Sequence, residues 1–97
     1  MQDLRDQLAE TLDEAEWSWL VPHVHRDAIV VVGADLDLVE AGMAIANDQV
    51  QMVERWINEQ MIYKPTADQL NDWERDRTQR FTTLIVQPYV LIKEPTA

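Results

Sequence analysis

The chain has 97 residues, and its 18 acidic side chains outnumber 8 basic ones, which gives a formal net charge of −10 at pH 7. This length suits a single domain over residues 1–97 with one modest hydrophobic core. The chain has no cysteine, so disulfides, thiolate nucleophiles and cysteine-ligated metal sites are excluded. The acid excess argues against broad binding to the phosphate backbone of nucleic acids, which requires Lys and Arg.

The sequence also bears on the cellular compartment. No segment approaches the roughly 20 apolar residues that a membrane-spanning helix needs. The first 16 residues are acidic and lack the basic and apolar regions of a signal peptide. Neither end carries a lipidation signal. We therefore expect a cytoplasmic protein that does not bind a membrane.

The first predicted element is an amphipathic helix. Apolar residues recur at helical spacing at Leu4, Leu8, Leu12 and Ala15. This spacing predicts a helix with one apolar face, which Asp3 can cap. Glu10 and three later acids crowd its C-terminal half, where the helix dipole disfavours them. The helix therefore depends on packing of its apolar face.

A short helix and a short strand are predicted next. Pro22 suits the first turn of a helix, which predicts a second helix over residues 22–26. Residues 28–32 read Ala-Ile-Val-Val-Val and end at Gly33. Four β-branched residues in a row before a glycine predict a short buried strand.

Three sequence patterns predict capping boxes that open helices, at residues 37–40, 48–51 and 66–69. The first of these helices ends at Asn47, and the second runs to about Gln60. Their close succession predicts a helix-turn-helix corner. Gly42 lies inside the first helix, where it costs about 1 kcal/mol relative to alanine, so it indicates close packing with another helix.

The remaining strands are predicted in the second half of the chain. Residues 61–63 form a short strand that stops before Pro65. Residues 74–80 are a charged connector, and residues 81–93 carry the last strand signal. Pro88 cannot donate to a ladder, so it must lie at an edge, a bulge or a break. The last four residues are expected to form a loose tail.

The order of these elements determines the predicted fold class. Helix, short strand, helix, helix, short strand, connector and long strand is the order of a winged helix-turn-helix domain. We therefore predict an α+β, winged-helix-like fold with a helix-turn-helix core and a small antiparallel sheet of two or three strands. The strand at 28–32 is placed at an edge of this sheet. A helical bundle with a small accessory sheet is the alternative.

The negative charge is concentrated in two segments. Residues 1–16 and 35–60 each carry six acids and one base, a net charge of −5, and the rest of the chain is balanced. These segments contain the helices that a winged helix would bring near DNA, where repulsion from phosphate opposes binding. Arg55 is the one base on the expected recognition helix, and Glu54 and Glu59 lie close to it. A DNA-binding regulator is therefore the alternative function, and nucleic acid is not the expected partner.

Few residues point to catalysis. His23 and His25 are the two histidines, and a metal site needs three or four converging ligands. A small metal-binding protein or enzyme that uses His23 and His25 is thus a second alternative. No HExxH, glycine-rich phosphate loop or GxSxG motif occurs, so we expect no enzyme activity, cofactor or metal.

The four tryptophans suggest a contact surface. Trp17 and Trp19 would point about 200° apart on a helix, so both can be buried only in an irregular segment or between two surfaces. We predict that Trp56 is in the core and that one of Trp17, Trp19 and Trp73 is a candidate for partial exposure, since tryptophan is enriched at interaction hot spots. The candidate interaction surface comprises Trp17, Trp19, His23, Met52, Arg55 and Trp73.

Several motifs together suggest a family. They are Glu16-Trp17, Pro22-His23, Arg26-Asp27-Ala28, residues 36–40 (Leu-Asp-Leu-Val-Glu), residues 44–48 (Ala-Ile-Ala-Asn-Asp), Trp56-Ile57, Lys64-Pro65 and residues 84–91 (Leu-Ile-Val-Gln-Pro-Tyr-Val-Leu). With these motifs the chain resembles, over nearly its whole length, the small bacterial family of domain of unknown function 2288. The resemblance implies a stand-alone cytoplasmic protein and supplies no activity, cofactor or site residue.

The sequence thus favours one function among three. We predict a non-catalytic protein-interaction or adaptor module with an acidic surface, whose partner is another protein with a basic surface. The tryptophans and the apolar C-terminal strand also leave a homodimer open, through strand edges or helices.

Overall fold

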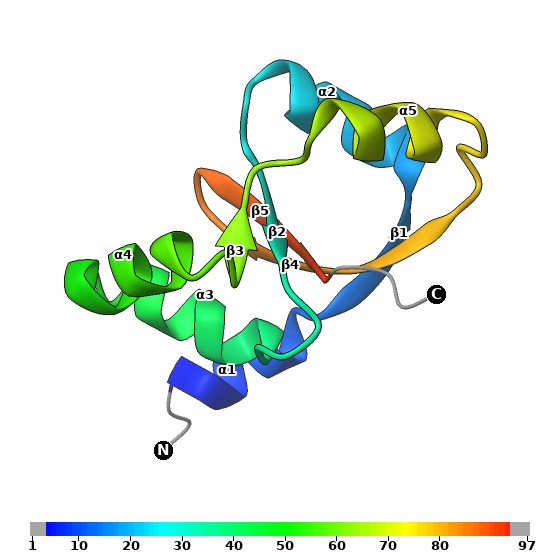
Figure 1. Cartoon of the computed structure of the whole chain (residues 1–97). Helices are drawn as coiled ribbons and strands as arrows, with labels where there is room; N and C mark the ends of the chain where they lie inside the picture. Colours follow the sequence, from blue (N-terminus) through cyan, green and yellow to red (C-terminus); the bar gives the residue numbers. More distant parts are fainter. Residues whose placement is uncertain (1–3, 94–97) are drawn as a thin grey trace.

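A computed structural model describes residues 4–93 of the chain (Figure 1). The predicted cap Asp3 and the predicted tail therefore lie outside the described residues. The elements in chain order are α1 (Leu4–Glu10), β1 (Asp13–Glu16), α2 (Trp17–His25), β2 (Ile29–Val32), α3 (Leu38–Ala46), α4 (Val50–Asn58), β3 (Ile62–Tyr63), α5 (Ala67–Glu74), β4 (Arg80–Val86) and β5 (Tyr89–Lys93).

The strands form one five-stranded mixed sheet in the order β1-β4-β5-β2-β3. Strands β2 and β5 pair parallel, and the other neighbours pair antiparallel. The prediction of an α+β protein is confirmed, but the prediction of two or three antiparallel strands is wrong, and a winged-helix arrangement is not shown. Strand β2 lies between β5 and β3 rather than at an edge. The sheet is larger than predicted because residues 81–93 fold into the hairpin β4–β5 and because β1 adds a further strand.

The predicted first helix is too long. Helix α1 ends at Glu10, and the acidic residues that follow form β1, which pairs with β4 so that Glu16 lies opposite Arg80. The helix ends early because acidic residues would otherwise lie near its C-terminal end, where carboxylates are disfavoured by the helix dipole. On the edge strand β1, Asp13 and Glu14 are exposed and Glu16 is half-buried. Charges on an edge strand discourage pairing with another chain.

Helix α2 begins at Trp17 rather than at Pro22, which lies inside it. The first N–H groups of a helix have no partner within it. Here the segment between α5 and β4 supplies the acceptors. Trp17 N–H donates to the carbonyl of Gln79 at 2.9 Å, and Ser18 N–H donates to the carbonyl of Arg77 at 3.1 Å. This partner is distant in sequence, so no local cap marks the start of the helix.

Of the three predicted capping boxes, one is confirmed in full and one in part. Asp37 accepts a hydrogen bond from the N–H of Glu40 at the start of α3. Thr66 and Gln69 form the full reciprocal capping box of α5. The predicted box at residues 48–51 is wrong, because Asp48 belongs to the end of α3 and no side chain caps α4.

Helices α2, α3 and α4 each end in a residue with left-handed backbone. These residues are Asp27, Asp48 and Gln60, with φ of 59°, 57° and 61°. At the end of α3, the N–H of Asp48 donates to Ile45 at 3.1 Å, and the N–H of the next residue donates to Ala44 at 2.9 Å. This is the Schellman pattern, which usually takes glycine at the left-handed position.

Helices cover both faces of the sheet (Figure 1), and each face has its own hydrophobic core. The aromatic core, under α2 and α5, comprises Trp17, Leu20, Ile29, Val31, Trp73, Phe81, Val90 and Ile92. The aliphatic core, on the side of α1, α3 and α4, comprises Val32, Leu36, Leu38, Ala41, Ile62, Leu84, Val86 and Leu91. Neighbouring residues of β2 and β5 thus point to opposite faces, as strand geometry requires.

Gly42 brings α3 close to the sheet. A Cβ atom at this position would lie 2.5 Å from the Leu84 Cδ2 atom of β4 and 3.5 Å from the Leu8 Cδ1 atom of α1. The prediction of close helix–helix packing is therefore correct for α1, but the tighter approach is to the sheet.

Candidate functional site

Helix α4 differs from its neighbours because it has a well-defined apolar side but no buried residue. Val53 and Trp56 are half-buried and pack against the aliphatic core. Val50 and Ile57 lie on the same side of the helix but are 53% and 52% exposed. The apolar stripe therefore extends beyond the contact that α4 makes with the rest of the protein.

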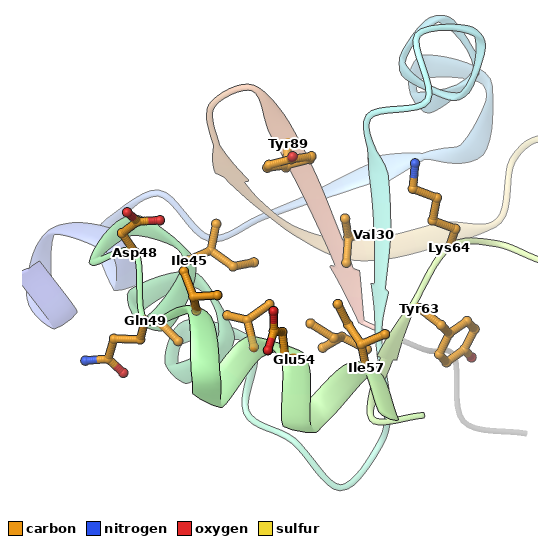
Figure 2. Close-up of a pocket in the computed structure, with 13 residues that line it drawn as sticks. Val30, Ile45, Asp48, Gln49, Glu54, Ile57, Tyr63, Lys64 and Tyr89 are labelled. Carbon is orange, nitrogen blue, oxygen red and sulfur yellow. The ribbon is translucent and has the colours of Figure 1, made fainter. Parts of the chain in front are cut away.

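The exposed part of this stripe lines a groove of about 430 Å³ between α4 and the sheet (Figure 2). We call it the α4 groove. Its apolar lining comes from α3, α4 and strands β2, β3 and β5, namely Val30, Ala44, Ile45, Val50, Val53, Ile57, Ile62 and Tyr89. Its polar lining residues are Asp48, Gln49, Glu54, Tyr63 and Lys64. This volume lies within the range of about 300–1,000 Å³ typical of ligand sites.

The sheet forms the floor of the α4 groove. Val30 pairs in register with Leu91 and lies on the same face, but it is only half-buried because α4 does not cover it. Tyr89, at the start of β5, is 40% exposed and lies across the groove from α4 (Figure 2). The groove therefore presents apolar surface on both its helical and its sheet side.

The charges around the α4 groove are not balanced. The Lys64 ammonium group is paired with the Asp27 carboxylate. The Tyr63 hydroxyl accepts a hydrogen bond from Gln69 Nε2 at 3.0 Å. In the part of the chain that the structure describes, no ion pair or side-chain hydrogen bond engages the carboxylate of Asp48 or Glu54. The groove thus offers two unneutralised negative charges beside an apolar lining.

Two residues of the predicted interaction surface are buried instead. Trp17 and Trp73 are 1% and 4% exposed, and their ring centroids lie 5.0 Å apart in the aromatic core. The prediction is wrong for both, because Trp17 at the start of α2 and Trp73 on α5 pack their rings against each other in this core. Trp17 Nε1 donates to Glu74 Oε1 at 2.9 Å. This hydrogen bond, followed by the one from Arg77, lowers the pKa of Glu74.

The other predicted surface residues do not line the α4 groove. Trp19 is 57% exposed, which agrees with the prediction that one of these tryptophans is partly exposed. His23 is half-buried and contacts the Arg26 guanidinium through Nδ1. Met52 and Arg55 line a shallow hollow on another side of α4, and Arg55 Nε lies 3.3 Å from Glu59 Oε1.

Trp56, predicted to be a core residue, is half-buried against the aliphatic core. Sequence reasoning placed Trp56 in the core and predicted no groove, because the spacing of the apolar residues of α4 does not show which of them stay exposed. The available signal was the breadth of this stripe, which includes both Val50 and Ile57.

The structure brings few chemically reactive groups together. Among residues 4–93, no three His, Asp or Glu side chains are grouped closely enough to hold a metal ion. The arginines of the connector are near acids, with Arg77 Nη2 lying 2.7 Å from Glu74 Oε2 and Arg75 Nη1 3.7 Å from Asp72 Oδ1. None of the helices in this part of the chain has the length and apolar character needed to cross a membrane.

Comparisons with known proteins agree with the resemblance found in the sequence. No curated protein matches the chain. The fold is similar to the NMR solution structure of PA1075 from Pseudomonas aeruginosa, with a TM-score of 0.80 and 31% identity, over 100% of this chain and 89% of that chain. The model of the protein family of unknown function DUF2288 matches residues 3–94. The chain therefore belongs to the DUF2288 family.

Proposed function

We propose that the protein is a non-catalytic interaction module that binds an apolar segment of another protein in the α4 groove. The observation that carries this proposal is the half-exposed apolar stripe of α4, which faces an equally apolar sheet surface across an open space. Contact with water is unfavourable for both apolar surfaces, and a bound apolar segment would remove them from water. The cytoplasm remains the expected compartment.

The exposed area supports binding of moderate strength. Full burial of a Val, Ile or aromatic side chain contributes about 1.5–3 kcal/mol, so completing the burial of a half-exposed one contributes about 1 kcal/mol. Val50, Ile57 and Tyr89 would each contribute such an increment. Association also costs rigid-body and side-chain freedom, so these three residues alone do not give tight binding. Polar or charged contacts at the rim are needed as well.

The open shape of the groove favours a protein segment as the ligand. The groove lies along α4 and is bordered by a helix on one side and a sheet on the other (Figure 2). Amphipathic helices bind in such apolar grooves through residues spaced three and four apart. An adaptor that displays the α4 groove needs no catalytic residue.

The alternative functions have less support. Helices α3 and α4 are consecutive and joined by residues 47–49, as a helix-turn-helix would require. However, segment 35–60 has a net charge of −5, and its one base, Arg55, is already paired with Glu59. A metal-dependent function would need further ligands near His23, and no such group exists among the residues that the structure describes.

A selection from a library of displayed random peptides on the immobilised full-length protein tests the proposal. We expect enriched peptides with apolar residues at helical spacing. Exchange of Ile57→Ser should weaken their binding about five- to tenfold, because it removes one apolar contact. Since Ile57 is half-exposed, this variant should keep the fold, which an NMR spectrum of the variant can verify.

Gln51→Ser is the matched control, because Gln51 is an exposed residue of the same helix that does not line the α4 groove. This variant should bind the selected peptides as the unmodified protein does. Equal binding to the Ile57→Ser variant, or no enrichment over an empty surface, would contradict the proposal.

A further inference from the structure

We propose that Asp48 and Glu54 make the part of the α4 groove from the α3–α4 turn to the middle of α4 a site for Lys or Arg, so that the occupant is an amphipathic segment of another protein with basic residues beside its apolar side. This inference rests on the proposed function and names the class of its partner. It depends on charge complementarity between the groove and the segment that fills it.

Asp48 is available for this role because it does not cap a helix. Its backbone has φ of 57° and its N–H donates to Ile45, which fixes its position at the turn between α3 and α4. Gln49 takes the N-cap position of α4, without a side-chain hydrogen bond. The carboxylate of Asp48 is therefore not engaged by the α4 N-terminus and lies at the lining of the groove.

Glu54 lies on the same side of α4 as the exposed apolar residues. It is four residues after Val50 and three before Ile57, and side chains at these spacings are neighbours on a helix. Neither neighbour carries a charge. By contrast, Glu59, which directly follows α4, has Arg55 as its i−4 partner. A ligand that covers Val50 and Ile57 thus places its own residues next to the Glu54 carboxylate.

The protein's own bases are engaged elsewhere. In the described part of the chain, five arginines are paired with acids: Arg5 with Glu40, Arg55 with Glu59, Arg75 with Asp72, Arg77 with Glu74, and Arg80 with Glu14 and Glu16. Lys64, which also lines the α4 groove, is paired with Asp27. The two remaining bases are also engaged: Arg26 contacts His23 Nδ1, and Lys93 donates to the carbonyls of Gly33 and Leu36. A bound segment would therefore supply the counter-charge of the two groove carboxylates.

The two ends of the α4 groove differ in charge. Figure 2 shows Asp48 at the end next to the α3–α4 turn, Lys64 at the opposite end near β3, and Glu54 between them. The acidic end would take the basic residues of the segment, and its apolar residues would lie against Ile57, Val30 and Tyr89. The segment is thus expected to bind in one orientation.

The same charges argue against a second copy of this chain as the occupant. Segment 35–60, which supplies α3 and α4, carries a net charge of −5, and the whole chain carries −10. Two such grooves facing each other would bring like charges together around an apolar contact. A partner with basic residues removes this repulsion and adds attraction.

The test uses the peptides selected on the immobilised protein. We expect them to be enriched in Lys and Arg next to their apolar residues. Asp48→Asn and Glu54→Gln should each weaken binding about two- to fivefold at low salt, as for an exposed ion pair, and the double variant about tenfold. Asn accepts left-handed backbone, so Asp48→Asn should keep the turn. The double variant should also lose most of the salt dependence.

Glu59→Gln is the control, because it removes a charge directly after α4 at a residue that does not line the groove. It should leave binding unchanged. Peptides that depend on Ile57 but lack basic residues, or that bind the double variant as tightly as the unmodified protein, would overturn this inference and leave the proposed function standing. Peptides that do not depend on Ile57 at all would overturn both.

Discussion

The two faces of the sheet are built differently, although they share the same strands. On one face three aromatic rings, Trp17, Trp73 and Phe81, pack with centroid distances of 5.0–5.8 Å under α2 and α5. On the other face the core is aliphatic, and α4 leaves part of the sheet open. Val31 is fully buried on the first face, whereas the preceding Val30 lines the α4 groove on the second. We infer that the aromatic face supplies much of the stability, which leaves the aliphatic face free to bind.

Truncation of the aromatic core should have the largest effect. Trp17→Ala should lower the free energy of unfolding by about 3–5 kcal/mol, the usual cost of removing a buried large side chain. Trp19→Ala, two residues further along α2, should change it by less than about 0.5 kcal/mol because that ring is largely exposed. Urea denaturation of both variants measures the difference. Similar losses for the two would show that the aromatic face does not dominate stability.

Gly42 of α3 lies very close to the sheet on the aliphatic face and does not line the α4 groove. Gly42→Val should lower the free energy of unfolding by about 1–3 kcal/mol, because the added atoms collide with the buried Leu84 side chain. Ile57→Ser on α4 of the same face should cost much less, since Ile57 is half-exposed. Chemical denaturation monitored by tryptophan fluorescence compares them. A greater loss of unfolding free energy for Ile57→Ser than for Gly42→Val would mean that Ile57 belongs to the aliphatic core.

The sequence predicts the buried strand β2 and the helix caps better than it predicts the α4 groove. Strand β2 and the caps at Asp37 and Thr66 follow from local patterns of a few residues, and the structure confirms them. Strand β1 was missed because it is stabilised by pairing with β4, which is distant in the sequence: Asp13 lies opposite Thr83. Asp48 was misassigned because the same residue type can cap a helix or follow one.

The α4 groove could be predicted only in part. The apolar stripe of α4 is plain in the sequence, but its spacing does not say which members are buried. This depends on how far α4 stands from the sheet, which is set by the end of α3 and the start of β3. The candidate surface based on tryptophan failed at Trp17 and Trp73 for a related reason, since composition does not show which side of a helix faces the core.

The hydrogen bond from Trp17 to Glu74 makes the aromatic face sensitive to acid. This bond and the one from Arg77 hold the pKa of Glu74 below its ordinary value of 4.5. The unfolded chain therefore takes up this proton first as the pH falls. The stability from the Glu74 charge is complete above about pH 4.5 and is lost as the pH falls through the lower pKa of the folded state.

Glu74→Gln tests this dependence, since the amide oxygen can still accept from Trp17 but carries no charge. We expect the unmodified protein to have a higher Tm than the variant near pH 7, and the difference to shrink as the pH falls below 4.5. Glu59→Gln, which removes an exposed carboxylate that pairs with Arg55, is the control for general charge effects. A Tm difference that stays constant as the pH is lowered well below 4.5 would rule out the linkage.

The smallest expected effect compares the ends of α4 and α2. Gln60 and Asp27 both occupy the left-handed position of a Schellman motif. Asp accepts this conformation more readily than Gln, and glycine accepts it without a steric penalty. Gln60→Gly should therefore raise the free energy of unfolding by about 0.5 kcal/mol, after the greater freedom of glycine in the unfolded chain is subtracted. Asp27→Gly should give no gain, because it also removes the ion pair with Lys64.

Urea denaturation of the two variants measures both changes, and peptide binding to Gln60→Gly should be unchanged because Gln60 does not line the α4 groove. A gain for Asp27→Gly but not for Gln60→Gly would show that the strain of the left-handed backbone lies at the end of α2 and not at the end of α4.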